Sequence, residues 1–165
     1  GGQRQFTDRL FAITNPQTGK VYGYAFSTWA LIDTTSRQPM DLAELPNGGF
    51  SSALIEKEIP IAGPGRIRLK NTENAVRTRQ AYYTDLDING HVNSIRYIEM
   101  MLDLFPAKQF EASPVKRLEV AYSAEAYAND LLQFYQEPSA KGDATLVEIR
   151  KEEGRIPVVK AAITF

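Results

Sequence analysis

The side chains best suited to chemistry gather in one short stretch, residues 83–94, which reads YTDLDINGHVNS. The stretch contains the only histidine of the chain and places polar residues at every second position: Asp85, Asp87, Asn89, His91 and Asn93. Alternate positions share a face only in an extended strand, yet a helical pattern begins at Val92. We therefore expect a carboxylate, an amide and an imidazole to converge on a helix N-terminus, where free N–H groups suit a developing oxyanion.

A purely structural interpretation of the same stretch is also open. Asn89, Gly90 and Asn93 favour turns and helix N-caps, and a lone histidine is commonly a structural residue. The density of polar groups around His91 favours an acid/base role instead, because nearby carboxylates and a helix terminus can tune an imidazole.

Composition excludes several classes of protein. The 165 residues include 19 Lys+Arg against 20 Asp+Glu, so the net charge of −1 gives no indication of a nucleic-acid or membrane partner. The absence of cysteine and the single histidine exclude a disulfide framework, a thiol nucleophile and a thiolate zinc site. We expect no metal and no cofactor. With no apolar run of roughly 20 residues, a cytoplasmic protein is the expectation.

Two patterns of elements follow one another along the chain. Residues 6–14 and 21–33 are rich in β-branched and aromatic types around the turn residues Pro16 and Gly19, which predicts a hairpin. The second arm is apolar on both faces near its end and is predicted to be a buried central strand. Residues 46–70 carry several prolines and glycines with little periodicity, as a linker does.

The rest of the chain predicts an α+β layer. Residues 75–87 read as a strand, and apolar residues then recur at helical spacing from Val92 until Pro106. Further strands are predicted at 117–126, 131–136, 145–151 and 156–165, with hairpin turns at Gly142 and Gly154. The expected fold is a curved antiparallel sheet wrapped around one long helix.

This order predicts two domains, of which the first is incomplete. We assign residues 1–60 to the late strands of a first unit and the start of a linker, 61–73 to the linker, and 74–165 to a complete second unit. The first unit lacks an initial strand and a helix to cover its sheet, so we expect it to be completed by preceding residues or by another chain.

The stretch YYTDLDINGHVNSIRYIEMMLDLFP closely resembles the signature loop and helix of the acyl-acyl carrier protein thioesterases. Residues 7–33 and the following TSRQP are similar to the late strands of the first hotdog domain in that family, and RLEVAYSAEAYANDLL to the strand after the second helix. The resemblance implies a double hotdog in which the early part of the first hotdog has no counterpart here.

The resemblance implies four catalytic residues, Asp87, Asn89, His91 and Glu125. Plant members carry a Glu-Cys pair where this chain has Glu125 and Ala126, so any catalysis must use carboxylates, amide, imidazole and water. Strand alternation also places Glu125 on one face with Glu119 and Ser123. Alternatively, Glu125 is a solvated carboxylate on a strand and has no catalytic role.

The implied activity is hydrolysis of fatty acyl-acyl carrier protein thioesters to free fatty acid. The substrate itself carries the phosphopantetheine, and the implied partners are acyl carrier protein, the acyl group and a second copy joined through the hotdog sheets. Arg66, Arg68 and Lys70 are candidates for docking the acidic carrier, although a solvated linker explains them as well. An acyl-CoA thioesterase relying on Asp87 and a non-catalytic acyl-binding module are the alternatives.

Overall fold

The computed structural model describes residues 5–46, 58 and 60–165. The chain divides into two compact units, residues 1–63 and 64–165, and the division falls within the segment predicted to be the linker. The assignment of these units as a partial and a complete domain stays a prediction, and each unit is described by itself.

The first unit contains the predicted hairpin. Strands β1 (Phe6–Thr14) and β2 (Val21–Ala30) pair antiparallel from Phe6↔Ala30 onward. The Asn15 side chain accepts backbone N–H bonds from Gln17 at 2.9 Å and Thr18 at 3.0 Å, which closes the turn. A short 3₁₀ helix, η1 (Leu42–Glu44), follows and is capped by Asp41.

The prediction that the second arm is a buried central strand is wrong for the described residues. No residue of β2 is buried, and Trp29 is 53% exposed. The physical reason is that β2 belongs to a two-stranded sheet with β1 among the described residues, and neither face of that sheet is buried.

The second unit is built on a five-stranded sheet of order β3-β5-β6-β7-β4 in which every neighbouring pair is antiparallel. Its strands are β3 (Arg77–Gln80), β4 (Arg117–Tyr122), β5 (Leu131–Pro138), β6 (Thr145–Lys151) and β7 (Pro157–Thr164). The four later strands confirm the predicted positions within a few residues. The predicted strand at 75–87 shortens to β3, because η4 (Tyr83–Asp85) interrupts it.

The long helix predicted from Val92 to Pro106 is not present. Helix α1 (Ser94–Leu102) has 9 residues, and a separate helix α2 (Ala107–Ala112) begins after Pro106. Val92 lies outside α1 because Asn93 is the N-cap and has extended backbone geometry, with ψ 139°. The Val92 N–H donates instead to the Ala126 carbonyl. At the C-terminal end of α1 the backbone hydrogen bonds change to the 3₁₀ pattern, in which Leu104 donates to Met101 and Phe105 donates to Leu102. Helical geometry is also disfavoured at Phe105 because a proline follows it.

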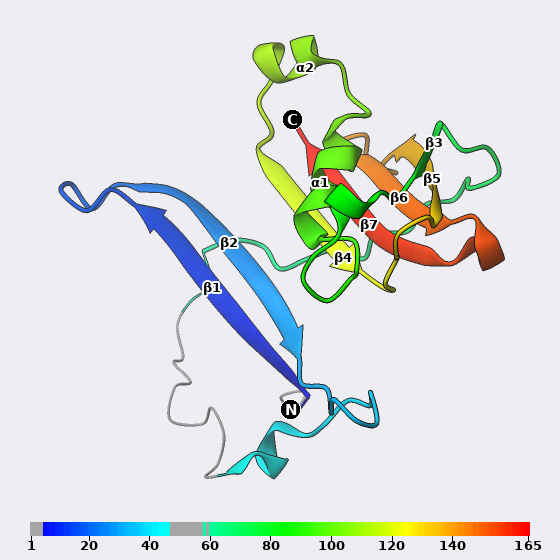
Figure 1. Cartoon of the computed structure of the whole chain (residues 1–165). Helices are drawn as coiled ribbons and strands as arrows, with labels where there is room; N and C mark the ends of the chain where they lie inside the picture. The colour runs from blue at the N-terminus through cyan, green and yellow to red at the C-terminus, as the bar shows by residue number, and fades with distance from the viewer. Residues whose placement is uncertain (1–4, 47–57, 59) are drawn as a thin grey trace. The chain divides into compact units, whose positions relative to one another are not determined.

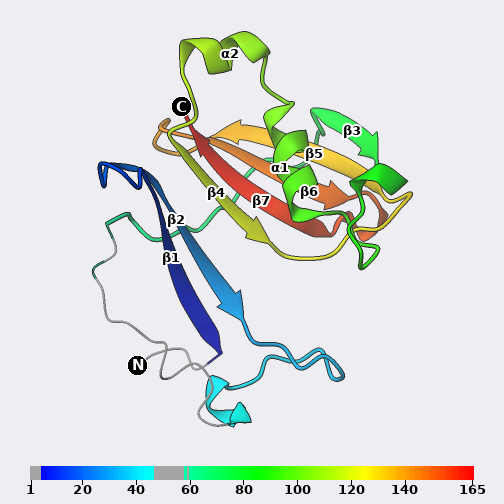
Figure 2. The same ribbon diagram turned by 60° about the vertical axis from the view of Figure 1, so that its left-hand side comes forward.

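The core of this unit lies between α1 and one face of the sheet (Figures 1 and 2). Alternation along the strands supplies the apolar layer. Helix α1 contributes Tyr97, Met100 and Met101, and the sheet contributes residues that include Leu132, Phe134, Val147, Ile149, Val159, Ala161 and Ile163. The arrangement is α+β with short helices, and the N-terminus of α1 is fixed over one end of the sheet.

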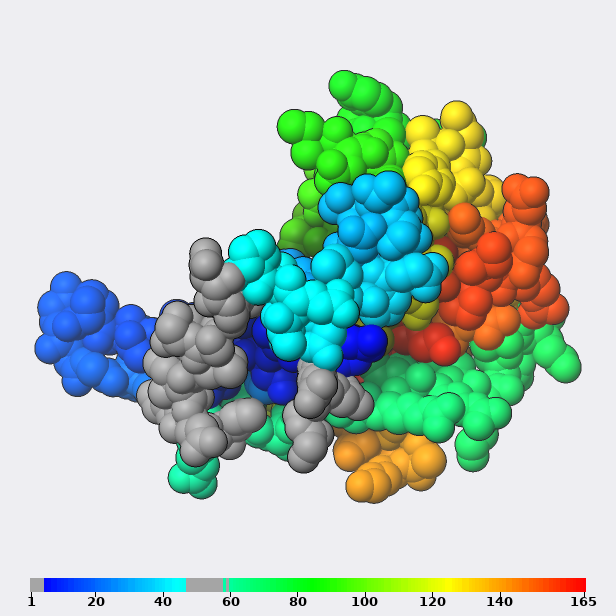
Figure 3. All heavy atoms as spheres, turned by 90° about the horizontal axis from the view of Figure 1, so that it is seen from below, coloured from blue at the N-terminus to red at the C-terminus, as the bar shows by residue number. Residues whose placement is uncertain are grey.

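Residues 65–71, here the crossing segment, cover the opposite face of the sheet. The Gly65 N–H donates to Glu119 on β4 at 2.7 Å, and the N–H groups of Lys70 and Asn71 donate to Glu137 on β5 at 2.8 and 3.0 Å. Figure 3 shows this green stretch beside the orange turn that follows β5.

The register of the sheet explains why this segment fits. Glu119, Ala162, Leu146 and Glu137 pair in turn across β4, β7, β6 and β5, so they form one row. Three strand spacings amount to roughly 14 Å, and five residues of extended chain span roughly 16 Å. Within the segment, Leu69 is buried whereas Arg66, Arg68 and Lys70 are exposed. The segment therefore buries one side chain against the sheet and presents three cations to solvent.

An ion pair between a buried aspartate and a partly buried arginine holds the connection between β3 and α1. Asp85 is 4% exposed, and Arg79 Nη2 donates to both of its carboxylate oxygens at 3.0 Å. The Tyr82 N–H donates to the same carboxylate at 2.8 Å, and the Asn93 N–H donates to the Asp85 carbonyl. Asp85 thus ties Tyr82, just before the polar stretch, and Asn93, near its end, to the same residue.

Replacing Asp85 by alanine should lower the free energy of unfolding by about 2–4 kcal/mol, since it leaves a partly buried Arg79 and an inward N–H without their acceptor. Urea denaturation followed by circular dichroism measures this. Asp103→Ala, at an exposed carboxylate, is the control and should change the value by less than about 0.5 kcal/mol. Equal stabilities of the two variants would contradict the role of Asp85.

Candidate active site

The polar loop between η4 and α1 is closed by its own aspartate. Asp87 Oδ1 accepts the N–H of Asn89 at 2.8 Å and of His91 at 3.2 Å, and the Asp87 N–H donates to the His91 carbonyl. Gly90 adopts φ +78°, a conformation that L side chains rarely adopt. Asp87 therefore fixes the loop that carries Asn89 and His91.

A second loop, residues 123–130, meets this one through backbone pairing. The Val92 N–H donates to the Ala126 carbonyl at 2.8 Å, and His91 forms an isolated antiparallel bridge with Tyr127. The second loop is itself tied to the sheet, because the N–H groups of Ser123 and Ala124 donate to Val158. The imidazole is thus placed against the residues that follow β4.

The structure brings His91 and Glu125 together. His91 Nε2 lies 3.4 Å from Glu125 Oε2, and the side chains are 28% and 41% exposed, so both reach solvent at this point. A half-exposed imidazole beside a carboxylate can move a proton to or from a bound water or substrate.

Glu125 does not share a strand face with Glu119, so the prediction from strand alternation is wrong, although Glu125 lies near the imidazole. Strand β4 ends at Tyr122, and Glu125 lies in the following loop. Glu119 instead binds the crossing segment on the opposite face of the sheet. Glu125 is positioned by the pairing between the two loops and not by the alternation of side chains along β4.

Asn89 and the neighbouring backbone differ in what they offer a substrate. The Asn89 side chain is exposed and makes no hydrogen bond within the described part of the chain. The N–H groups of Gly90, His91 and Val92 donate to acceptors of the two loops, and that of Asn93 donates to Asp85 at the end of η4. In this arrangement the side-chain amide of Asn89, not those backbone groups, is the donor open to a substrate oxygen.

Two of the predicted polar residues have structural roles instead. Asp85 is buried and paired with Arg79, and Asn93 is the N-cap of α1, where its side chain accepts the Ile95 N–H at 2.9 Å. The five polar residues therefore do not line one face. They divide between the support of the loop and the neighbourhood of His91.

Tyr127 is a residue near His91 that the sequence analysis missed. Its O–H donates to Glu125 Oε2 at 3.0 Å, and its ring meets the imidazole edge-on with centroids 5.1 Å apart. The spacing of two residues between Glu125 and Tyr127 is the signal that was available, since such residues share a side wherever the chain is extended.

Two tyrosines support the start of α1. The Tyr122 O–H donates to the Ser94 carbonyl at 3.1 Å, and the ring packs against that of Tyr97 at 6.4 Å. Burial raises the pKa of Tyr97 well above its usual range, and burial likewise raises the pKa of Tyr122. Both phenols stay protonated at neutral pH and act as structural groups.

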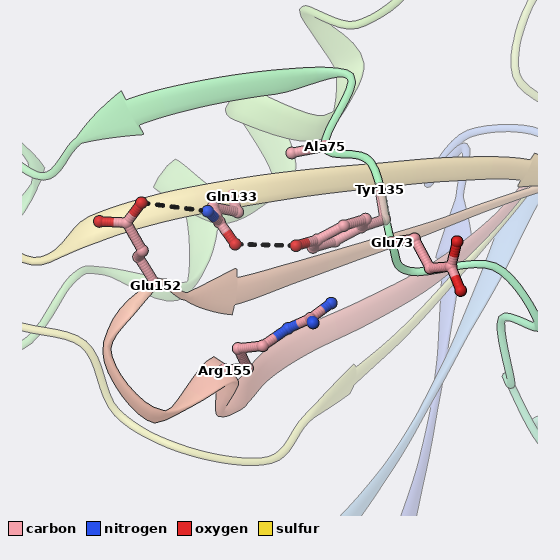
Figure 4. Close-up of a pocket in the computed structure, with 6 residues that line it drawn as sticks. All are labelled: Glu73, Ala75, Gln133, Tyr135, Glu152 and Arg155. Carbon is pink, nitrogen blue, oxygen red and sulfur yellow. Dashed lines mark hydrogen bonds between the residues drawn. The ribbon is translucent and has the colours of Figure 1, made fainter.

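A separate open pocket of about 280 Å³ lies on the face of the sheet away from α1 (Figure 4). Two of its hydrogen bonds join lining residues, because Tyr135 donates to Gln133 and Gln133 donates to Glu152. Arg155 donates to the Thr72 carbonyl, which is not part of the lining. We place no function there. Within the described residues, no three His, Asp or Glu side chains cluster as metal ligands would, and no helix is long and apolar enough to span a membrane.

Comparison with known proteins adds independent information on this arrangement. Residues 69–165 match the family model of the acyl-ACP thioesterase C-terminal domain, where ACP is acyl carrier protein. A crystal structure of an acyl-ACP thioesterase from Bacteroides thetaiotaomicron is 39% identical, with a TM-score of 0.88 over 100% of this chain and 65% of that chain. The 12:0-ACP thioesterase from Umbellularia californica is 18% identical with a TM-score of 0.76 over 99% of this chain and 62% of that chain, a likeness of fold.

Among curated proteins, the chain is 23% identical over 129 residues to the chloroplastic palmitoyl-acyl carrier protein thioesterase of Gossypium hirsutum, covering 76% of this chain and 31% of that protein. It is 24% identical to the dodecanoyl-[acyl-carrier-protein] hydrolase of Cinnamomum camphora, covering 74% and 33%. The chain therefore spans about a third of the length of these relatives. The solved structures establish a hotdog-like α+β fold. Since the family model covers more than half of the chain, the chain belongs to the acyl-ACP thioesterase family, through its C-terminal domain.

Proposed function

We propose that this chain hydrolyses fatty acyl thioesters of acyl carrier protein, with Asp87, Asn89, His91 and Glu125 as its site residues. The observation that carries the proposal is the 3.4 Å approach of His91 Nε2 to Glu125 Oε2 inside the region matched by the family model. The relatives named above supply the substrate class, since their names describe hydrolysis of acyl-carrier-protein thioesters.

The roles follow from the chemistry of the groups. Water adds to the thioester carbonyl, the C–S bond breaks, and the products are the free fatty acid and the phosphopantetheine thiol of the carrier. Glu125 removes a proton from that water or attacks the carbonyl itself to give an anhydride, two routes that share this geometry. His91 positions the water or shares its proton.

The other two residues serve the carbonyl oxygen. Asn89 donates its side-chain amide to that oxygen as negative charge develops, which lowers the barrier. Asp87 acts through its two backbone hydrogen bonds, which hold Asn89 and His91 in place. No step needs a thiol, in agreement with the absence of cysteine.

Glu125→Gln and His91→Ala should each lower kcat on palmitoyl-acyl carrier protein by about a hundred- to ten-thousand-fold, because each removes a proton-transfer group. Glu111→Gln, an exposed carboxylate on α2, is the matched control and should keep full activity. Parallel assays on palmitoyl-CoA test the carrier. Retention of half the activity by Glu125→Gln, or a strong preference for CoA, would contradict the proposal.

Asn89→Ala should lower kcat by about a hundred- to a thousand-fold with little change in KM, as loss of an oxyanion donor does. Steady-state kinetics on the same substrate separate the two constants. Asn74→Ala, at another exposed asparagine, should match the parent protein. A change confined to KM would instead assign Asn89 to substrate binding.

The crossing segment supplies a candidate surface for the carrier. Arg66, Arg68 and Lys70 occupy alternate positions and are all exposed, while the segment is held at both ends by Glu119 and Glu137. We propose that this row of fixed cations docks the acidic carrier protein, because complementary charge steers association.

Replacing Arg66, Arg68 and Lys70 together by alanine should raise KM for palmitoyl-acyl carrier protein about tenfold at low salt. The KM for palmitoyl-N-acetylcysteamine should stay the same, because a small neutral thiol replaces the carrier protein in this substrate. A variant with the exposed residues Lys20, Lys108 and Lys141 replaced by alanine also loses three positive charges and controls for total charge. Equal KM changes for both substrates would remove this surface from the proposal.

A further inference from the structure

We propose that Tyr127 is a positioning residue that holds the Glu125 carboxylate and the His91 imidazole in register, an inference that rests on the proposed function. Two contacts support it. The Tyr127 O–H donates to Glu125 Oε2 at 3.0 Å, and the aromatic ring lies edge-on to the imidazole with centroids 5.1 Å apart. One side chain therefore touches both groups of the pair.

The hydrogen bond selects one rotational state of an exposed carboxylate. Glu125 is 41% exposed, and its hydrogen bond to Tyr127 favours one of the rotamers open to a glutamate side chain. Tyr127 and His91 both approach the same oxygen, Oε2. Fixing that oxygen orients the carboxylate toward the imidazole before substrate arrives, which is the preorganisation that catalysis requires.

Tyr127 can do this because its own backbone is held on several sides. It bridges His91 in antiparallel fashion, and its N–H donates to Asp130 Oδ2 at 2.9 Å. The ring also lies 5.9 Å from Lys151 Nζ, on β6. The Tyr127 hydroxyl therefore reaches Glu125 from a backbone that is held to the loop carrying His91 and to Asp130, the residue before β5.

Substitution can separate the two contacts of Tyr127. Phenylalanine keeps the ring on His91 and removes the O–H, whereas leucine removes both. Because Tyr127 is 45% exposed, neither change opens a cavity, and thermal unfolding should be that of the parent. Tyr83→Phe, at an 86% exposed tyrosine, is the matched control.

In the full chain, Tyr127→Phe should lower kcat on palmitoyl-acyl carrier protein about tenfold while KM stays constant, since a hydrogen bond to a charged group is lost. Tyr127→Leu should lower kcat further. The Tyr83→Phe control should match the parent. A kcat within twofold of the parent for Tyr127→Phe, or a loss confined to KM, would overturn the positioning role.

A second measurement does not depend on activity. Because the chain has one histidine, its NMR spectrum contains one imidazole Cε1–H signal. Tyr127→Leu should move this signal by removing the ring current, and Tyr127→Phe should leave it close to the parent position. Identical signals for Tyr127→Leu and the parent would overturn the ring contact. Hydrolysis absent from the parent, with the expected NMR shifts, would reject the proposed function and retain the contact between Tyr127 and His91.

Discussion

The candidate site depends on one backbone hydrogen bond, from the Val92 N–H to the Ala126 carbonyl. The two loops it joins follow β3 and β4, the strands at opposite edges of the sheet. Neither loop could place its polar side chain alone, because His91 and Glu125 are both partly exposed and far apart in sequence. Pairing the loops converts two surface residues into neighbours 3.4 Å apart.

The pairing of the two loops is supported by groups that take no part in the proposed chemistry. Asp85 binds Arg79 and Tyr82 on the β3 side, and Asn93 caps α1 just after His91. Val158 accepts from the loop after β4. The stretch is dense in polar residues because it has two tasks. Asp85, Asp87 and Asn93 hold the loop, whereas Asn89 and His91 face the reacting atoms in the proposed mechanism.

Turn residues and β-branched and aromatic composition predicted the hairpin. Alternation against the core, together with glycine turns, predicted the four later strands. The helix was predicted too long, since apolar spacing continues through Leu104 and Phe105 although the last turn has already tightened before Pro106. Glu125 came from a family resemblance, and the alternation offered in support was wrong because β4 ends earlier. The spacing of two residues between Glu125 and Tyr127 was visible in the sequence, whereas the contact of Tyr127 with His91 depends on pairing between the two loops.

The crossing segment has a mechanical consequence for the second unit. Tension applied to the chain at residue 64 would first load the Gly65 bond to Glu119, at the β4 edge of the sheet. The anchors at Glu137 would carry load only after that bond had broken, and β3 would follow later still. The crossing segment thus bears a force applied from its N-terminal side before that force reaches β3, the strand that leads into the loop carrying His91.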